Sequence, residues 1–433
     1  MQTNHSGLFG GQSIEALERS IREEGGVYYA DFSNLRIGTG FQQVFSTTHQ
    51  RQVGFEAFFR GVGPVGSPLF SKELFSLVGS EEDAVQLDRM RLLLHLKNFA
   101  AAGVDDRWLF LNIHPKLMMG WKDPDVAFLK ELLAHVRLSP GQLVVQLREH
   151  AGNFETVLTR TMSALKDLGC AVLFDDFRTD QANLDRIWRL HPDIVKLQRS
   201  FLENANHNPN AKRMFYRLIS AIHGAGSLVQ VEKVENEEEA ILARRMEVDF
   251  VQGQFWGDPL SQATRRDAGD ASDLFHQVLA HCEREVAQDA RLLSQEMGGY
   301  TNEFMECAWK LEDGAELKDA ALGLVGVEGV ERVYLLNHDG VQTGPNIFPV
   351  EVMQALRAQK FRPLKDTTGA TWTRRGPFKN ALMNPGIVQY SPPYRSIVSR
   401  NTCSTLSRSI RQAGQPLMVL CCDVQWTEAM ILS

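Results

Sequence analysis

The sequence predicts an α/β protein: a closed β/α barrel of the TIM type, followed by a long connector helix and a smaller α+β domain. At 433 residues the chain is too long for one ordinary hydrophobic core, which favours two domains. Short apolar runs alternate with helical patterns as far as residue 260. Roughly eight such runs in roughly 250 residues are typical of a closed barrel of parallel strands.

The predicted barrel strands are the continuous apolar runs, at 36–45, 52–59, 108–113, 143–147, 171–177, 193–198, 227–234 and 250–256. Helical patterns lie between these runs, for example over 81–103 and 153–169. The second helix is expected to begin after an N-cap at Asn153 and to end at Gly169.

The pattern changes after Leu260. Apolar residues from Phe275 to Leu311 mostly recur at steps of three or four, which predicts a long helix broken at most at Gly298-Gly299. This seam could pack on its own domains or form a dimer stripe. The expected divisions are a helical lead-in at 1–29, the barrel at 30–262, the connector helix at 263–312 and a domain with an antiparallel sheet at 313–433.

Composition excludes several classes of protein. Hydrophobic residues make up 43% and charged residues 23%, as in soluble globular proteins, and the net charge of -7 argues against a general nucleic-acid binder. A small anionic ligand is still compatible with this charge. The first twenty residues lack the pattern of a signal peptide, no apolar run could span a membrane, and the six cysteines lack ligand spacing. We therefore expect a cytoplasmic protein with reduced thiols.

Polar residues stand at the end of each predicted strand, where β/α barrels carry their working residues. One such residue is usually a solvated strand end, but a series over seven strands indicates a shared site, because buried polar groups need partners. Oxygen ligands without His or Cys suit Mg²⁺ or Mn²⁺, and two such ions can clamp a phosphodiester. The residues are Glu56, Asn112, Gln146, Asp175 with Asp176, Lys196, Glu232 with Glu235, and Gln252.

Over roughly residues 30–262 these segments resemble the EAL domain, a bacterial family of cyclic di-GMP phosphodiesterases. The matching segments are FEAFFRG (55–61), FLNIHP (110–115), LFDDFRTDQANL (173–184), DIVKLQRSF (193–201), VEKVENEEE (231–239) and FVQGQFWGDPL (250–260). The resemblance implies Mg²⁺ or Mn²⁺ ligands, if any metal is retained, at Glu56, Asn112, Gln146, Asp175 and Glu232. In an active enzyme Lys196 and Glu235 would assist the attacking water. The implied nucleotide contacts are Gln42, Arg60, Pro115, Asp176 and Gln252.

Four departures from the family pattern surround this pocket. Gln146 stands where the family has a metal-binding Glu, so one negative charge is missing. Residues 178–181 replace a loop with two glycines, Gln198 replaces an Asp and Lys233 replaces a Gly. Phe58 also replaces the usual Leu of the signature. Together these changes favour a degenerate site.

Three functions follow from this resemblance. The leading hypothesis is a cyclic di-GMP signalling protein that acts as a nucleotide receptor or regulatory scaffold with little or no hydrolysis. The second is an active, metal-dependent cyclic di-GMP phosphodiesterase. The third is a protein-interaction module that no longer binds nucleotide.

The segments YLLNHDGVQ, QYSPPYRS, CSTLSRSI and LMVLCCDVQW more loosely resemble the sheet of PAS/Cache sensor domains. This resemblance implies a pocket for an unknown small ligand, for which Trp372, Arg375, Tyr390 and Tyr394 are candidates, or else core residues. A homodimer and a protein partner are also expected.

Overall fold

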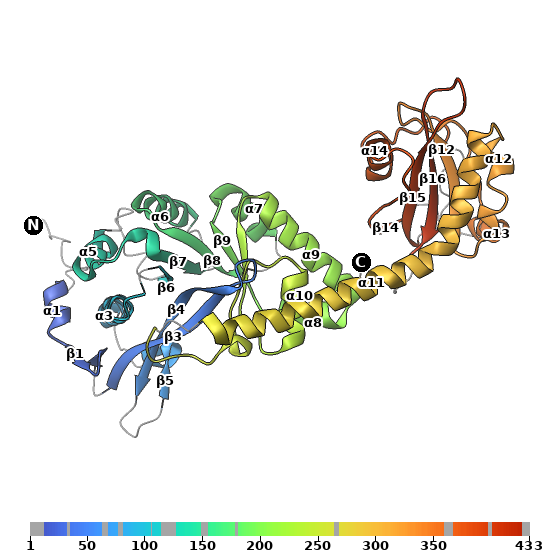
Figure 1. Cartoon of the computed structure of the whole chain (residues 1–433). Coiled ribbons are helices and arrows are strands. Elements are labelled where there is room, and N and C mark those ends of the chain that lie inside the picture. The colour runs from blue at the N-terminus through green and yellow to red at the C-terminus, as the bar shows by residue number, and fades with distance from the viewer. Residues whose placement is uncertain are drawn as a thin grey trace, which may run out of the picture. The chain divides into compact units, whose positions relative to one another are not determined.

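The computed structural model describes residues 13–32, 35–62, 68–76, 81–104, 106–113, 127–148, 155–177, 181–263, 268–358, 367–396 and 401–426. The chain divides into two compact units, one ending at Cys282 and one beginning at Glu283 (Figure 1). No helix in these ranges is long and apolar enough to cross a membrane.

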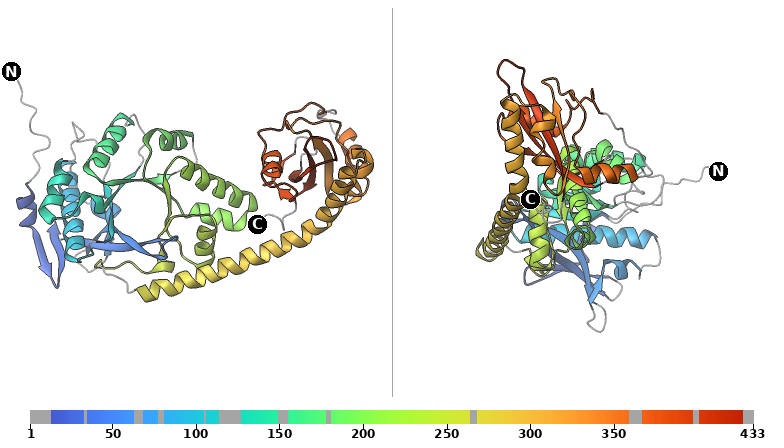
Figure 2. Two further views of the ribbon diagram at one scale, coloured as in Figure 1. Left: turned by 45° about the horizontal axis from the view of Figure 1, so that its top comes forward. Right: turned by 90° about the vertical axis from the view of Figure 1, so that its right-hand side faces the viewer.

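Eight strands of the first unit close into the predicted barrel. They are β3 (Leu35–Ser46), β4 (Arg51–Val62), β6 (Trp108–Ile113), β7 (Leu143–Arg148), β8 (Ala171–Phe177), β9 (Ile194–Leu197), β10 (Leu228–Val231) and β11 (Phe250–Val251). Closure comes from β3, which pairs with both β4 and β11 (Figure 2).

The expectation that all barrel strands run parallel is wrong for β3. This strand is antiparallel to β4 and to β11, whereas the other neighbouring pairs of the barrel are parallel. Residues 47–50 form a turn that connects β3 directly to β4. A parallel connection needs a crossover of about a dozen residues or more, so a link this short forces an antiparallel pair.

The lead-in is also less helical than expected. After the short helix α1 (Ile14–Glu18) come two strands, β1 (Ile21–Glu24) and β2 (Val27–Phe32), which pair as a hairpin and extend the sheet beside β3. Gly25 and Gly26 have φ values of 61° and 80°. A two-residue hairpin turn of type I′ needs positive φ at both positions, which glycine adopts without strain. At the other side β5 (Pro68–Phe70) extends β4.

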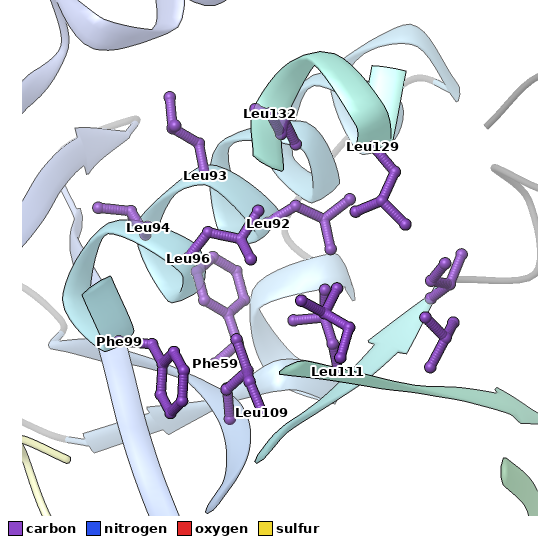
Figure 3. Packing of buried hydrophobic residues seen from close by; sticks show 14 of the residues in the cluster. Phe59, Leu92, Leu93, Leu94, Leu96, Phe99, Leu109, Leu111, Leu129 and Leu132 are labelled. Atoms are coloured by element: carbon purple, nitrogen blue, oxygen red, sulfur yellow. The ribbon is translucent and has the colours of Figure 1, made fainter. Parts of the chain in front are cut away.

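Helices cover the outer face of the barrel. They are α2 (Ser71–Ser76), α3 (Glu81–Ala101), α5 (Ala127–Val136), α6 (Glu155–Leu168), α7 (Gln181–Leu190), α8 (Ser200–His207), α9 (Pro209–Gly224) and α10 (Glu237–Arg245), with the 3-10 turns η1 (Pro140–Gln142) and η2 (Gln254–Trp256). Asn153, the expected N-cap of α6, lies outside the described residues. Figure 3 shows leucines of α3 and α5 packed against Phe59, Leu109 and Leu111 of the strands.

The inside of the barrel has an apolar layer below a polar one. The apolar layer consists of Val44, Phe110, Val144, Leu173, Ile194 and Phe250, with Val53 and Ala171 packed against it. Alternate residues of a strand share a face, so the next inward positions lie two residues further toward the open end of the barrel. These positions carry Gln42, Asn112, Gln146, Asp175, Lys196 and Gln252. The fold therefore gathers the predicted polar residues into one layer.

The predicted connector is a single helix, α11 (Ala268–Glu312), of 45 residues, which Gly298 and Gly299 do not interrupt. Phe275, Val278 and Cys282 pack in a core of the first unit. Met297, Phe304, Cys307 and Leu311 pack in the core of the second. The described residues of the seam thus mostly pack on their own units, and Val286 is 56% exposed.

The second unit has the expected antiparallel sheet. Its elements are α12 (Leu317–Ala320), η3 (Leu324–Gly326), β12 (Val330–Leu336), α13 (Val350–Ala358), α14 (Gly376–Met383), β13 (Gln389–Tyr390), β14 (Tyr394–Arg395), β15 (Thr402–Ile410) and β16 (Met418–Gln425). The strand order is β12-β16-β15-β13, and β14 pairs with β15. Residues of α11 pack on one face of the sheet and residues of α14 on the other. The adjacent Cys421 and Cys422 enter these two different cores, as expected for neighbours on a strand.

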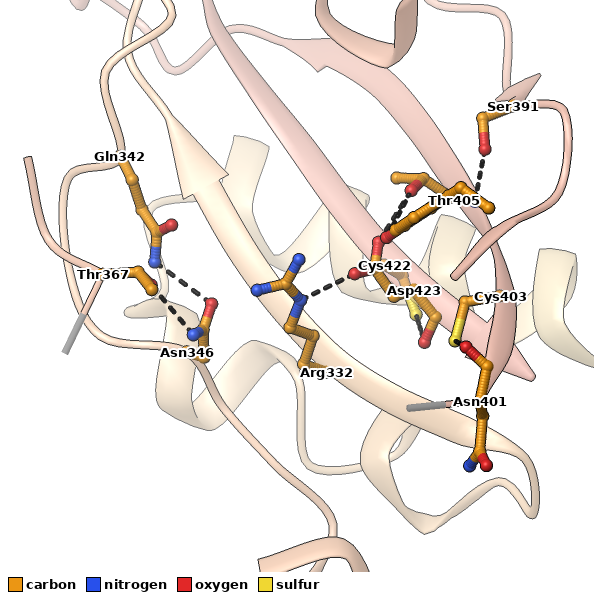
Figure 4. Close-up of polar contacts among 11 residues, drawn as sticks. Arg332, Gln342, Asn346, Thr367, Ser391, Asn401, Cys403, Thr405, Cys422 and Asp423 are labelled. Carbon is orange, nitrogen blue, oxygen red and sulfur yellow. Dashed lines mark hydrogen bonds and ion pairs between the residues drawn. The ribbon is translucent and has the colours of Figure 1, made fainter. Parts of the chain in front are cut away.

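A buried ion pair joins the neighbouring strands β12 and β16 of this sheet (Figure 4). Nε of Arg332 donates to Oδ2 of Asp423 at 2.6 Å, and their side chains are only 7% and 1% exposed. The hydroxyl of Thr405 donates to the other carboxylate oxygen at 2.7 Å. Burial would lower the pKa of Arg332, but the charge of Asp423 raises it above its ordinary value. Each charge of this pair therefore depends on the other.

We expect Asp423→Asn to lower the free energy of unfolding by about 3 kcal/mol, because it leaves the guanidinium of Arg332 buried without a counter-charge. Urea denaturation of the full chain, followed by tryptophan fluorescence, measures this loss. The double variant Arg332→Met, Asp423→Leu removes both charges and should recover most of the stability. Equal stability of Asp423→Asn and the wild type would contradict the structural role of the pair.

Candidate functional site

Lys196 lies at the centre of the polar layer. From β9 its ammonium nitrogen lies 2.9 Å from Oε2 of Glu56, 3.2 Å from Oε2 of Glu232 and 3.4 Å from Oε1 of Gln146. An ammonium group has three N–H donors, and these three oxygens match them in number. The side chain is only 2% exposed. Lys196 therefore joins residues from β4 and β7 with the loop that follows β10.

The charges of this cluster fix the protonation state of Lys196. Burial alone would lower its pKa, but the carboxylates of Glu56, Asp175 and Glu232 outweigh burial and hold the pKa above its ordinary value. The lysine is therefore an ammonium ion throughout the physiological pH range. It offsets one of the three negative charges around it.

Nitrogen donors contact both oxygens of Glu56 and both oxygens of Glu232. The second oxygen of Glu56 accepts from the side-chain amide of Asn112 at 3.1 Å. The second oxygen of Glu232 lies 3.5 Å from the ammonium of Lys233. Each of the four carboxylate oxygens thus lies within 3.5 Å of a nitrogen of the chain.

The sequence predicts a divalent metal ion in this polar layer. Carboxylate and amide oxygens suit a hard cation in their chemistry. In this arrangement, however, the carboxylate oxygens of Glu56 and Glu232 that would coordinate such a cation are in ion pairs with Lys196 and Lys233. Among the residues that the structure describes, no three Asp, Glu, His or Cys side chains form a group that could hold a metal ion. The polar layer as built does not fit a divalent cation.

Gln146 is completely buried between the apolar layer and Lys196. Its amide oxygen accepts from Lys196, and its amide nitrogen has no hydrogen-bond partner among the described residues. A glutamate at this position would add a fourth negative charge beside Lys196. With glutamine, the layer has an amide donor and less negative charge.

The loop carrying Glu232 is held by close backbone contacts. The amide of Val234 donates to the carbonyl of Gln252 at 2.9 Å, and the amide of Phe255 donates to the carbonyl of Val234 at 3.1 Å. A Cβ atom on Gly253 would lie 2.1 Å from the carbonyl oxygen of Val234, so only glycine fits there. These contacts fix the loops after β10 and β11 against each other.

Glu235, predicted to assist a water molecule, is paired with Arg199. One guanidinium nitrogen lies 2.7 Å from its carboxylate, and another donates to Glu239 at 2.9 Å. Glu239 in turn accepts from the backbone amide of Glu235 at 2.8 Å. The sequence analysis did not predict this role of Arg199. The acidic run after residue 234 was the available signal, because so many carboxylates favour a basic partner.

Three of the predicted nucleotide-binding residues, Gln42, Arg60 and Gln252, are among the described residues, and they lie at the same end of the barrel. The amide of Gln42 donates to the carbonyl of Gly257 at 2.8 Å, and Gln252 accepts from Gln230 at 3.1 Å. Pro115 lies outside the described residues, as do residues 178–180 and the side chain of Asp176.

Arg60 follows Glu56 by four residues on β4 and stacks on Phe58. Its guanidinium carbon lies 4.9 Å from the centre of the Phe58 ring. Gly40 faces Phe58 across the β3–β4 pair, and a Cβ atom there would lie 2.4 Å from that ring. Gly40 therefore provides the space for the larger residue that replaces leucine in the signature.

Arg91 of α3 supports the end of β6 and was also missed. Its guanidinium donates to the backbone carbonyl of Asn112 at 2.6 Å and to Asp88 at 2.7 Å. Both members of the pair are buried. A charged pair three residues apart in a mostly apolar helix was the sequence signal for such a role.

The four predicted sensor residues separate into two groups. The ring of Trp372 lies 5.1 Å from that of Tyr334 and 5.5 Å from the guanidinium of Arg332. The hydroxyl oxygen of Tyr394 lies 3.3 Å from that of Thr405, next to Asp423. Tyr390 instead contacts Thr301 of α11 at 2.8 Å, and Arg375 is exposed where α14 begins. The structure thus places two of the four around the Arg332–Asp423 pair, which the sequence reading did not identify.

Comparisons with known proteins agree with the fold. The sequence profile of the EAL domain matches residues 28–259. Cyclic di-GMP phosphodiesterase PdeF of Escherichia coli is 32% identical over 136 residues, which are 30% of this chain and 17% of that protein. YkuI of Bacillus subtilis, an uncharacterized EAL-domain containing protein, is 25% identical over 57% of this chain and 61% of that protein. The chain therefore spans less than two thirds of each of these relatives.

The crystal structure of YkuI with c-di-GMP, described as its substrate, and calcium shares the fold of this chain. The TM-score is 0.72, with 20% identity over 90% of this chain and 96% of that chain. The likeness includes both units. Because the EAL profile covers more than half of the chain, including the strands that carry the polar layer, the chain belongs to the EAL domain family.

Proposed function

We propose that this protein is a cyclic di-GMP receptor or regulatory scaffold whose EAL barrel binds the nucleotide and hydrolyses it little or not at all. The observation that carries this proposal is the buried Gln146, whose amide lies beside Lys196 where the family has a metal-binding glutamate. The relatives PdeF, a cyclic di-GMP phosphodiesterase, and YkuI, solved with c-di-GMP, support this choice of nucleotide.

Two features of the polar layer oppose hydrolysis. Replacing a carboxylate ligand by an amide removes charge that would stabilise a divalent ion, at a cost of several kcal/mol in a dry site. The three donors of Lys196 are matched by Glu56, Glu232 and Gln146, so its ammonium has no further proton to direct at an attacking water. Glu235 is paired with Arg199 instead.

Binding of the nucleotide does not require the groups that hydrolysis needs. Arg60 offers a guanidinium for a phosphate oxygen, and its Nε atom is buried without a partner among the described residues. Gln42 and Gln252 offer amides, and Pro115 and Asp176 complete the proposed contacts. If Mg²⁺ or Mn²⁺ binds at all, Glu56, Asn112, Asp175 and Glu232 are its proposed ligands, with the oxygen of Gln146.

The second unit is proposed to be a PAS/Cache-like sensor that regulates the barrel in a cytoplasmic homodimer. Trp372 and Tyr394 around the buried Arg332–Asp423 pair support a ligand-responsive region in this unit. The described seam residues of α11 mostly pack on their own units, so the proposed dimer and any protein partner would use other surfaces.

Titration of the purified full chain with cyclic di-GMP tests the receptor function. Isothermal titration calorimetry in Mg²⁺ or Mn²⁺ should show binding, and chromatography of the same samples should show no linear dinucleotide. Turnover at about 1 s⁻¹, an ordinary enzymatic rate, would contradict the receptor function and favour the phosphodiesterase. Absence of binding at millimolar nucleotide would contradict both functions and favour a protein-interaction module that no longer binds nucleotide.

Gln146→Glu should strengthen Mn²⁺ binding at least about tenfold, because a fourth carboxylate restores charge that opposes Lys196. Electron paramagnetic resonance of free Mn²⁺ measures the affinity directly. Gln277→Glu, an exposed position on α11, makes the same change away from the barrel interior and should have no effect. An unchanged Mn²⁺ affinity of Gln146→Glu would show that Gln146 does not lie at a metal position.

A further inference from the structure

Lys233 places a second ammonium group beside the polar layer. Its Nζ atom lies 3.5 Å from one oxygen of Glu232, and its side chain is 70% exposed. The other oxygen of Glu232 lies 3.2 Å from the buried Lys196. Glu232 therefore bridges one lysine inside the barrel and one lysine at its surface.

The backbone at Lys233 adopts a conformation that favours glycine. Its φ of 58° lies in the left-handed region, where the Cβ atom of an L-residue is crowded. The loop is held in this conformation by the contacts of Val234 with Gln252 and Phe255. Glycine would suit this backbone better than lysine. A residue kept in a disfavoured conformation next to a candidate site points to a contribution from its side chain.

Gln146 and Lys233 change the charge of the polar layer in the same direction. Glu56, Asp175 and Glu232 are the carboxylates whose charge acts on Lys196. Lys196 offsets one of them and Lys233 offsets a second. The amide of Gln146 is buried beside Lys196 and adds no negative charge to the layer. Two of the three negative charges are therefore offset by the chain's own lysines, which lowers the repulsion that an approaching anion meets.

The two lysines have different access to a ligand. Lys196 is 2% exposed, and its three donors already face three oxygens. Lys233 has three donors as well, and Glu232 can accept only one of them at the observed contact. Its remaining N–H groups can reach a phosphate oxygen without any loss of the internal pair.

We propose that Lys233 is an anion-binding residue whose charge, added to that of Lys196, lets the barrel bind a phosphodiester without metal. This inference rests on the proposed function for the identity of the nucleotide. It adds the residue that supplies the positive charge and makes binding independent of Mg²⁺ and Mn²⁺.

The test compares cyclic di-GMP affinity of the full chain in Mn²⁺ and in a chelator. The wild type should bind equally within about threefold in both, because neutralisation is internal. Lys233→Gly should weaken binding in chelator about tenfold, an effect expected for loss of a charged contact. This variant suits the left-handed backbone, so its folding is not at risk. Lys233→Gln removes the charge but keeps the Cβ atom and should weaken binding similarly.

Lys310→Gln is the matched control, since Lys310 is an exposed lysine of α11 that pairs with Glu306 at 3.8 Å. It should leave the affinity unchanged. Mn²⁺ titration of the protein without nucleotide gives a second readout, in which Lys233→Gly should bind Mn²⁺ more tightly than the wild type.

A wild type that binds the nucleotide only with Mn²⁺ would overturn the inference and leave the receptor function intact. If Lys233→Gly binds cyclic di-GMP in chelator as tightly as the wild type does, the inference is likewise overturned and the receptor function remains. Hydrolysis in Mn²⁺ combined with metal-free binding would overturn the receptor function alone. Absence of binding under both conditions would overturn both.

Discussion

The ion pairs of Lys196 with Glu56 and Glu232 are the interaction on which the candidate site depends. Three carboxylates at the open end of a barrel need positive charge, since buried charges without a partner are strongly destabilising. The apolar layer of Phe110, Val144 and neighbouring residues excludes water below them, which strengthens every charge interaction above. A lysine from β9 supplies the compensating charge within the chain.

The surrounding residues hold this ion-pair cluster in place. Arg91 binds the carbonyl of Asn112 and so supports the residue that contacts Glu56. The close approach of Gly253 to Val234 fixes the loop carrying Glu232. Because these supports come from a helix and from loops on both sides, they fix the carboxylates relative to Lys196. Residue 146 then decides how much negative charge remains.

The sequence predicted the parts of the fold that follow from periodicity. The runs at 108–113 and 171–177 coincide with β6 and β8, and the polar strand ends do share one layer. The direction of β3 could not be predicted, because the apolar pattern of a strand is the same in both directions. The pairing of Arg199 with Glu235 joins residues that are distant in sequence, and the positive φ of Lys233 has no signal in the residue itself. The pairing of Arg332 with Asp423 could not be predicted either, because the two charged residues lie far apart in the sequence, each within an apolar strand.

The central claim is that Lys196 acts as the cation of the polar layer. The most direct measurement is a crystal structure of the full chain grown in Mn²⁺, with anomalous scattering recorded to locate the ion. The structure predicts no Mn²⁺ bound to Glu56 or Glu232, and an ammonium of Lys196 that remains between them. One or two Mn²⁺ ions bound by these carboxylates, with Lys196 displaced, would contradict it.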